Sequence, residues 1–299
     1  MTGPDNLDTL EAESIYILRE TAAEFRKPAL LYSIGKDSSV MLRLAQKAFA
    51  PGHIPFALLH IDTSYKFPEM LEFRDRMARD TGVNLIVHRN EQALAEGANP
   101  FRLGIERCCQ ALKTQALKDA IAQNGIDAAI GGARREEERS RAKERVFSVR
   151  DGHGQWDPKR QRPEIWNLYN CRLGKDQTMR VFPLSNWTEL DVWEYIRRER
   201  IPVVDLYFAR MRPTVLRGGK LLPAYHDLPL LPGENVEMVM SRMRSIGCTY
   251  CSGAIRSEAC TIDAIVEEVA AFRRSERENR LIDYDQDASM ELKKREGYF

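Results

Sequence analysis

A polar loop that contains a glycine, residues 33–39 (SIGKDSS), separates two apolar segments and constrains the fold more than any other part of the chain. Residues 29–32 (ALLY) predict a short buried strand, and Val40, Leu44 and Ala48 recur at the spacing of a helix. The loop is therefore expected to leave a strand and open a helix. Because the first backbone N–H groups of a helix are unpaired, such a loop is suited to binding a phosphate group.

The side chains of this loop also suit an anionic ligand. Lys36 supplies a mobile positive charge, Ser38 and Ser39 supply hydroxyl donors, and Asp37 can help to cap the helix. The loop is not the common nucleoside-triphosphate loop, because that motif requires a serine or threonine directly after the lysine. A second Gly-Lys-Asp sequence, at residues 174–176, lacks a preceding apolar strand and predicts a surface turn.

The charge balance excludes some classes of partner. The chain of 299 residues carries 45 basic and 44 acidic side chains, so it lacks the basic surface of a protein devoted to nucleic acid or to an anionic membrane. No apolar run reaches the length of a membrane span, and residues 1–5 lack the basic start of a signal peptide. We therefore expect a cytoplasmic protein whose six cysteines are reduced thiols or metal ligands more often than disulfides.

Apolar segments typical of strands alternate with segments of helical periodicity. Strands are predicted at residues 56–62, 84–88 and 126–130, and helices at residues 68–80 and 109–123. This alternation predicts an α/β fold in which a doubly wound, mostly parallel sheet is covered by helices on both faces. Ligands of such sheets bind beyond the carboxyl ends of the strands, where the polar loop is expected to lie.

The chain is expected to divide into two parts. Residues 1–200 form the predicted nucleotide-binding domain, and residues 201–299 form a helical and irregular extension that contacts a partner. Within the first part, Thr188 and Asp191 have the spacing of a helix-initiating capping box. Within the second part, residues 262–280 predict a final amphipathic helix.

A second polar stretch, residues 131–145 (GGARREEERSRAKER), follows the last of the predicted strands. Gly131 and Gly132 allow a ligand to approach the backbone closely, and Arg134 and Arg135 are suited to two-point contacts with phosphate or sulfate oxygens. The alternative is a solvated helix whose glutamates and arginines neutralise one another. Because the stretch begins at a strand end, the anion-binding interpretation is favoured.

Asp62 lies at the end of the second predicted strand. Its carboxylate can coordinate Mg²⁺ or contact the nucleotide, since Mg²⁺ takes one or two carboxylates together with phosphate oxygens. The alternative is an aspartate that ends a strand and starts a turn. His60 shares the face of Asp62, and a hydrogen-bonded core histidine is favoured there over a ligand contact.

These motifs resemble those of a known family. The loop is similar to the S-x-G-K-D-S loop of the ATP pyrophosphatases, which grip the pyrophosphate end of ATP and cleave between its α- and β-phosphates. Over nearly the whole chain, the sequence resembles the small, catalytic subunits of heterodimeric bacterial ATP sulfurylases, relatives of the 3′-phosphoadenylylsulfate reductases. The fold that this implies is of the adenine nucleotide alpha hydrolase type. The segments that carry the resemblance are LEAESI (10–15), LLYSIGKDSSVML (30–42), FRDR (73–76), GGARREEERSRAKER (131–145), WDPKRQRPE (156–164), RVFPLSNWTELDVWEYI (180–196) and SMELKKREGYF (289–299).

The resemblance implies that ATP and sulfate are converted into adenosine 5′-phosphosulfate and pyrophosphate. It also implies ATP and Mg²⁺ as cofactors and a separate GTPase large subunit as the partner. Lys36, Arg134 and Arg135 are the implied catalytic residues, which neutralise charge on the reacting anions. The residues implied to bind ATP are Ser33, Gly35, Lys36, Asp37, Ser38, Ser39, Asp62, Gly131 and Gly132.

Four of the cysteines depart from the ordinary sulfurylase small subunit. Cys108 and Cys109 form one pair, and Cys248 and Cys251 form a Cys-x-x-Cys pair. The two pairs resemble the ligands of the [4Fe–4S] cluster in adenylylsulfate reductases. A zinc site would use the same number of thiolates, and four reduced thiols without a metal are the third interpretation.

The cysteines leave alternative functions open. An iron–sulfur adenylylsulfate reductase is one alternative, but such enzymes use a nucleophilic cysteine in a C-terminal tail, and residues 291–299 contain none. A sulfurylase paralogue that carries a cluster is the second alternative. The third is a non-catalytic subunit that binds nucleotide and docks the GTPase. The missing cysteine favours adenylation over reduction.

Overall fold

The computed structural model describes residues 5–137, 139–225 and 228–271, and a six-stranded sheet forms its centre. The strand order is β3-β2-β1-β4-β6-β5, in which β5 runs antiparallel to β6 and the other neighbours pair in parallel. This arrangement confirms the predicted fold class. The strands are β1 (Pro28–Leu31), β2 (Ala57–Ile61), β3 (Leu85–His88), β4 (Ala128–Ile130), β5 (Phe147–Arg150) and β6 (Thr178–Val181).

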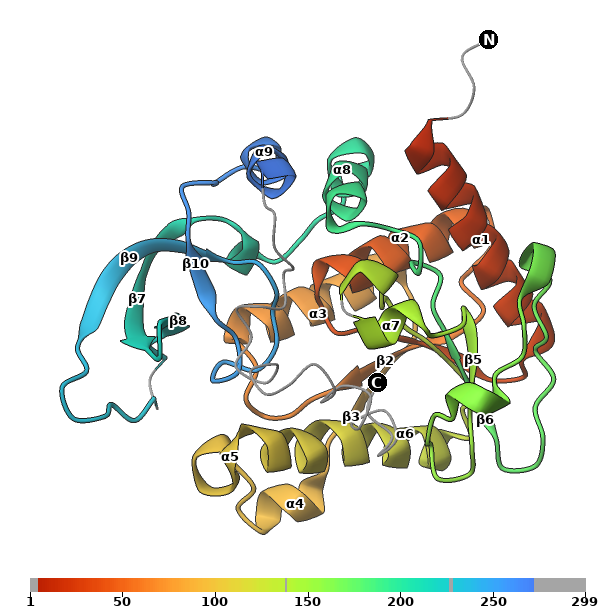
Figure 1. The fold of residues 1–299 in the computed structure, drawn as a ribbon, viewed down its shortest axis with the longest axis horizontal. Helices are drawn as coiled ribbons and strands as arrows, with labels where there is room; N and C mark the ends of the chain where they lie inside the picture. The colour runs from red at the N-terminus through yellow and green to blue at the C-terminus, as the bar shows by residue number, and fades with distance from the viewer. Residues whose placement is uncertain (1–4, 138, 226–227, 272–299) are drawn as a thin grey trace.

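Helices cover both faces of the sheet (Figure 1). Leu30 belongs to the apolar cluster that also contains residues of α1, α2 and α8, whereas the preceding Ala29 packs in a second cluster with Leu117 and Ile121 of α6. Because both faces are buried, the central strands are almost wholly apolar and could be predicted as short apolar runs. The helices of this part are α1 (Asn6–Glu24), α2 (Lys36–Phe49), α3 (Pro68–Thr81), α4 (Glu91–Ala95), α5 (Pro100–Cys109), α6 (Ala116–Asn124), α7 (Arg139–Ala142) and α8 (Glu189–Glu199).

One of the predicted helices is divided in two by a change of helical geometry. In place of a single helix at residues 109–123, α5 ends at Cys109, a π-helical turn spans Gln110–Gln115, and α6 continues from Ala116. Single π-helical turns inside α-helices are frequent at functional sites. The adjacent Cys108 and Cys109 therefore lie immediately before a widened turn.

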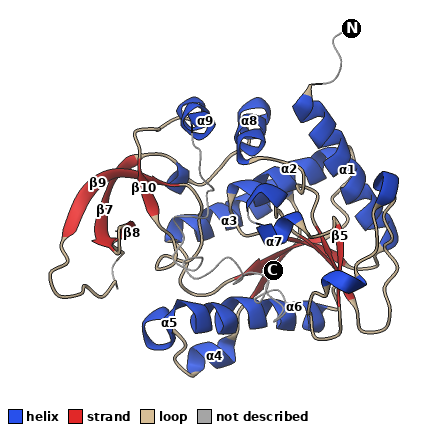
Figure 2. Ribbon diagram, viewed as in Figure 1, coloured by secondary structure: helices blue, strands red, loops and turns tan. Residues whose placement is uncertain are grey.

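The C-terminal part contains a closed antiparallel barrel with the strand order β10-β8-β7-β9, which lies beside the sheet (Figure 2). These strands were not predicted from the sequence, because β7 contains Pro213 and β9 exposes Met238 and Met240, so the alternation of polar and apolar residues is broken. The last helix, α9 (Ile262–Ala271), begins where the sequence predicts it. The rest of the predicted helix and the charged tail lie outside the described residues. The strands are β7 (Arg210–Arg217), β8 (Lys220–Pro223), β9 (Val236–Met243) and β10 (Ala254–Arg256).

Three smaller predictions concern local structure. The capping box is confirmed, because the Thr188 hydroxyl accepts a hydrogen bond from the Asp191 amide (3.1 Å) and the Asp191 carboxylate accepts one from the Thr188 amide (2.8 Å). The second Gly-Lys-Asp sequence forms an exposed turn, closed by the Gln177 amide and the Gly174 carbonyl (3.3 Å). Among the described helices, none has the length and apolar character needed to cross a membrane. A boundary at residue 200 stays a prediction.

Candidate active site

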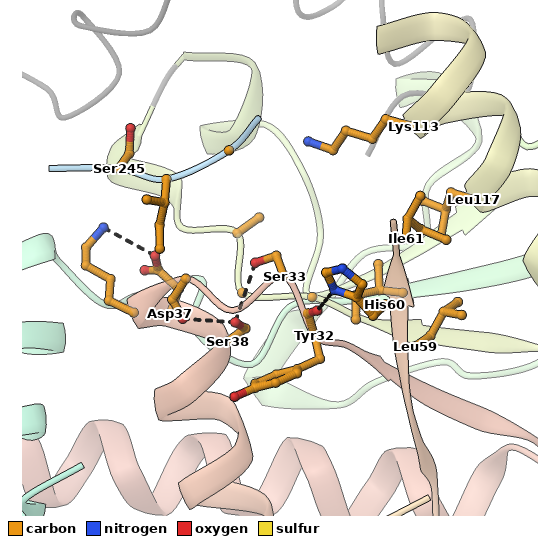
Figure 3. A pocket seen from close by; sticks show the side chains of 18 of the residues that line it. Tyr32, Ser33, Asp37, Ser38, Leu59, His60, Ile61, Lys113, Leu117 and Ser245 are labelled. Atoms are coloured by element: carbon orange, nitrogen blue, oxygen red, sulfur yellow. Dashed lines mark hydrogen bonds and ion pairs between the residues drawn. The ribbon is translucent and has the colours of Figure 1, made fainter. Parts of the chain in front are cut away.

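A cavity of about 210 Å³ lies at the carboxyl ends of β1, β2 and β4 (Figure 3). Figure 3 shows the side chain of Ser33 on the loop after β1 and those of Asp37 and Ser38 in the first turn of α2. Lys113 reaches toward the cavity from the helical layer, and Ser245 lies on another side. The predicted ligand-binding residues that line the cavity are Ser33, Gly35, Lys36, Asp37, Ser38, Gly131 and Gly132. The sheet thus brings the two motifs together, as expected for strand ends of a parallel sheet.

The loop after β1 delivers the amino end of α2 to this cavity. Gly35 is the N-cap residue and no side chain caps the helix, so the expected cap by Asp37 is not formed. The Lys36 amide instead donates a hydrogen bond to the hydroxyl of Tyr207 (2.8 Å), which lies far away in the sequence. The Ser38 hydroxyl donates to the Gly35 carbonyl (2.9 Å), so the loop is held in place before a ligand binds.

Ile34 holds the loop in a strained backbone conformation. Its φ angle is +69°, in the left-handed region, although its side chain is β-branched and only 1% exposed. Such conformations cost energy and persist where the surrounding packing fixes them, most often at functional sites. The burial of Ile34 therefore helps to fix the shape of the loop after β1.

Alternating charges connect the loop to the second motif. Asp37 pairs with the Lys36 ammonium (3.3 Å) and with Nε of Arg134 (3.1 Å), and Glu137 pairs with Arg141 (2.9 Å) and lies 3.8 Å from Arg134. Arg134 is 1% exposed and stands behind the cavity lining, whereas Arg141 and Glu137 line the cavity. The network positions cations of both motifs around one space.

Besides Arg134, two residues predicted in the second motif and the loop do not line the cavity. Arg135 donates a hydrogen bond to the side chain of Asn186, in the segment before α8, and Ser39 is buried on α2. A catalytic role for Arg135 stays a prediction, and its position favours Arg141 as the arginine that meets a ligand. The segment that the sequence singled out does reach the cavity, and the turns within it decide which arginine faces that cavity.

Asp62 lies at the end of β2, where the sequence places it, but its carboxylate is engaged. One oxygen accepts two hydrogen bonds from Arg89 (2.6 and 2.9 Å), and the other accepts one from the Ser64 amide (2.8 Å). Burial alone raises the pKa of this carboxyl, and the hydrogen bonds from Ser64 and Arg89 outweigh it, so the pKa of Asp62 is lowered. Because Asp62 lies outside the cavity lining, its role as a Mg²⁺ ligand stays a prediction.

His60 is the hydrogen-bonded core histidine that the sequence favoured. Its Nδ1 lies 2.8 Å from the backbone oxygen of Tyr32, which can only accept, so Nδ1 carries the proton. Burial lowers the pKa of His60 to about 4. The ring is therefore neutral at pH 7 and lines the cavity, where Nε2 has no hydrogen-bond partner among the described residues.

Several lining residues carry no signal in a single sequence. Lys66 follows β2, Lys113 lies in the π-helical turn, and Tyr207 comes from the segment before β7. Residues 245–247 come from the segment after β9. Lysines surround anionic substrates by charge without a fixed spacing. These residues could be found only by knowing which distant segments the fold brings to the cavity.

The two predicted cysteine pairs also come together. Cys108, Cys109, Cys248 and Cys251 line a second cavity of about 10 Å³, separate from the first. The Cys248 sulfur lies 3.1 Å from the Thr63 hydroxyl. In the described part of the chain, no three histidine, cysteine or carboxylate side chains are already arranged around one metal ion. The number and type of these side chains fit a four-thiolate centre.

The fold and the site define an α/β protein with a mostly parallel sheet and a cavity lined by cations at the carboxyl ends of its strands. The model of the phosphoadenosine phosphosulfate reductase domain matches residues 27–254. The chain is 60% identical over 295 residues to the sulfate adenylyltransferase subunit 2 of Myxococcus xanthus, covering 98% of this chain and 97% of the relative. It is 58% identical over 299 residues to the protein of the same name from Azospirillum brasilense, covering 100% and 99%. The chain belongs to the sulfate adenylyltransferase subunit 2 family, which confirms the resemblance found in the sequence.

A solved structure with a similar fold is the phosphoadenylyl-sulfate reductase of Candida auris in its phosphate complex. It is 17% identical to this chain, with a TM-score of 0.47, and the match covers 69% of this chain and 91% of that one.

Proposed function

We propose that this chain adenylates sulfate: an oxygen of sulfate attacks the α-phosphorus of ATP, the bond from that phosphorus to the β-phosphate oxygen breaks, and pyrophosphate leaves. Membership of the sulfate adenylyltransferase subunit 2 family supports this reaction. The observation that carries it is the cavity, in which the amino end of α2 and a ring of cationic side chains face one space. The cations that line it are Lys36, Lys66, Lys113 and Arg141.

The chemistry needs positioning and charge neutralisation more than a nucleophile. ATP and sulfate are both anions, so an enzyme must hold them together and stabilise the charge that develops on the leaving pyrophosphate. We assign the pyrophosphate end of ATP to residues 33–38, because the amino end of a helix and Lys36 meet there. We assign sulfate or the α-phosphate to Arg141, which lines the cavity, with Arg134 nearby.

Mg²⁺ belongs to the finer part of this proposal. The cavity lining includes the carboxylates of Asp37 and Glu137, which fits the preference of Mg²⁺ for one or two carboxylates with phosphate oxygens. When bound, Mg²⁺ would neutralise charge on the phosphates. Asp62 is less suited to this role than Asp37, since Asp37 lines the cavity and Asp62 does not.

A GTPase large subunit is the proposed partner. The relatives are named subunit 2, which implies another subunit. Adenylyl transfer from ATP to sulfate is energetically uphill, and the present 299 residues contain no G-x-x-x-x-G-K-[ST] loop with which to hydrolyse GTP. A separate GTPase would supply the coupling.

A second candidate function is reduction of adenylylsulfate. The four thiols around one cavity favour it, whereas the absence of cysteine from residues 291–299 opposes it. The two reactions leave different products, because reduction releases sulfite and adenylation releases pyrophosphate. Measuring both products in the same preparation separates them.

The test is an assay of the complex of this chain with its large subunit, supplied with ATP, sulfate and GTP. We expect adenosine 5′-phosphosulfate and pyrophosphate, with the rate lowered roughly 10²–10³-fold by Lys36→Ala. Lys175→Ala is the matched control, because it alters the lysine of the exposed Gly-Lys-Asp turn and should leave the rate unchanged. Sulfite as the main product, or equal rates for Lys36→Ala and the wild type, would overturn the proposal.

A further inference from the structure

The four clustered cysteines come from two segments that are distant in the sequence. Cys108 and Cys109 end α5, and Cys248 and Cys251 lie in the turn between β9 and β10. Consecutive residues of an α-helix point about 100° apart, so simple packing would bury one of two neighbours. Here both Cys108 and Cys109 are at most 9% exposed, and both line the same small cavity.

The turn that carries the second pair is tightly built around Cys248. The Cys248 carbonyl accepts hydrogen bonds from the amides of Cys251 and Ser252 (both 3.0 Å). The Gly247 amide donates to the Ser252 hydroxyl (2.9 Å), and the Thr249 amide donates to the Tyr65 carbonyl (2.8 Å). The backbone is therefore folded so that both sulfurs of the Cys-x-x-Cys pair face the cavity.

Aromatic rings shield this group of thiols. Tyr250 packs edge-on against Phe101 of α5, with ring centroids 4.6 Å apart, and also against Tyr65, at 5.9 Å. The contact joins the cysteine-bearing turn to the cysteine-bearing helix. Shielded thiols that converge from two segments are the arrangement in which a soft metal ion links two parts of a chain.

Both cysteine-bearing segments also form part of the wall of the nucleotide cavity. Ser245, Ile246 and Gly247 precede Cys248 directly and line that cavity. Lys113 lies in the π-helical turn that follows Cys109, and it lines the same cavity. Any group that fixes the thiols therefore fixes the wall against which the nucleotide binds.

We propose that the four thiolates bind a thiophilic metal centre, either a single zinc ion or an iron–sulfur cluster, and that this centre holds the wall of the nucleotide cavity in place. Four thiol protons leave to solvent as the metal–sulfur bonds form. The thiols are not yet arranged around one ion, so metal binding also orders the two segments. The proposal requires a nucleotide in the cavity, but it does not depend on sulfate being the acceptor.

The first experiment measures metal and acid-labile sulfide in protein purified without oxygen. About one zinc per chain without sulfide, or about four iron atoms with matching sulfide, supports the proposal and identifies the centre. Cys251→Ser should lose the metal, whereas Cys260→Ser, which alters an exposed cysteine outside the cluster, should retain it. Wild-type protein that holds neither metal in stoichiometric amount overturns the proposal.

The second experiment measures the link to the nucleotide cavity. Removing the metal with a chelator should weaken ATP binding at least about fivefold and increase hydrogen exchange at residues 245–252. The chelated wild type needs no substitution, so a failure of Cys251→Ser to fold does not affect this comparison. Lys36→Ala should retain the metal while binding ATP poorly, which separates this proposal from the proposed reaction. Equal ATP affinity with and without the metal would refute the link.

Discussion

The parallel sheet and the C-terminal barrel contribute to the same cavity but differ in their sequence patterns. The strands of the sheet are short apolar runs covered on both faces, with Leu30, Leu58 and Ile130 fully buried. The barrel strands mix charged and apolar residues, so Arg212 is buried while Met238 is 58% exposed. The sheet supplies the loop of residues 33–39, and the C-terminal part supplies one wall of the cavity. Regular sequence patterns therefore reveal the sheet, and irregular patterns conceal the residues of that wall.

The largest expected effect on stability comes from removing an ion pair that joins the sheet domain to the C-terminal part. Glu189 begins α8, and its carboxylate forms a buried ion pair with Arg244 (2.6 Å), whose next residue lines the cavity. Glu189→Gln removes the carboxylate from this buried ion pair, which costs about 3–5 kcal/mol. Urea denaturation of the purified chain measures this as a lower midpoint.

An exposed ion pair gives the matched control for that change. Asp157 pairs with Arg160 (3.4 Å) at the surface, where the side chains are 49% and 87% exposed. Asp157→Asn keeps the hydrogen bond to the Lys159 amide and should alter the free energy of unfolding by less than about 0.5 kcal/mol. If both substitutions lower the free energy of unfolding equally, burial does not determine how strongly an ion pair stabilises this chain.

The next largest effect is a pH dependence of stability that arises from His60, which lines the cavity from the sheet. Burial lowers the pKa of His60 to about 4, whereas the unfolded chain takes up this proton near pH 6.5. Stability is therefore present above pH 6.5 and is lost as the pH falls toward 4, by up to about 3 kcal/mol. His60→Asn can keep the hydrogen bond to Tyr32 but should remove this part of the pH dependence.

Unfolding free energies of wild type and variant across that pH range provide the measurement. His53→Asn, at an exposed position, is the control and should follow the wild-type curve. Parallel curves for the wild type and His60→Asn would mean that the buried imidazole does not resist protonation.

The smallest expected effect concerns the hydrogen bond between Tyr207, in the C-terminal part, and Lys36, at the start of α2. Tyr207→Phe keeps the edge-on contact with Trp193 but removes the hydroxyl that accepts the Lys36 amide. We expect a loss of about 1 kcal/mol in the free energy of unfolding, measured by thermal denaturation. Tyr16→Phe, on an exposed ring, should leave the melting temperature unchanged. A Tyr207→Phe protein as stable as the wild type would show that the wall does not support the loop.

The sequence was sufficient to predict the sheet and the loop, because strand ends of a parallel sheet converge. Ser33, Lys36 and Gly131 could thus be assigned to one site from separate motifs. It was not sufficient to decide between Arg135 and Arg141, because the intervening short turns set the direction of each side chain. Nor could it reveal the partner of Asp62, since Arg89 follows another strand.

The cysteines and the wall residues show the same limit. The resemblance to adenylylsulfate reductases predicted that the two cysteine pairs share a site, and the structure places both pairs on one cavity. Which group they bind depends on the separation of the sulfurs, which spacing does not determine. Tyr207 and Ser245 carry no motif, so only the packing of the C-terminal part against the sheet places them in the site.

The π-helical turn at Gln110–Gln115 has a consequence for how this chain can change by deletion. If the six residues of that turn adopted α-helical geometry without a deletion, the preceding helix would rotate by about 100° relative to α6. The rotation would carry Cys108 and Cys109 away from their cavity, while Leu117 stays packed on the sheet. The wider turn therefore sets the phase that brings the two cysteines to their cavity, and its loss must be matched by the loss of one residue.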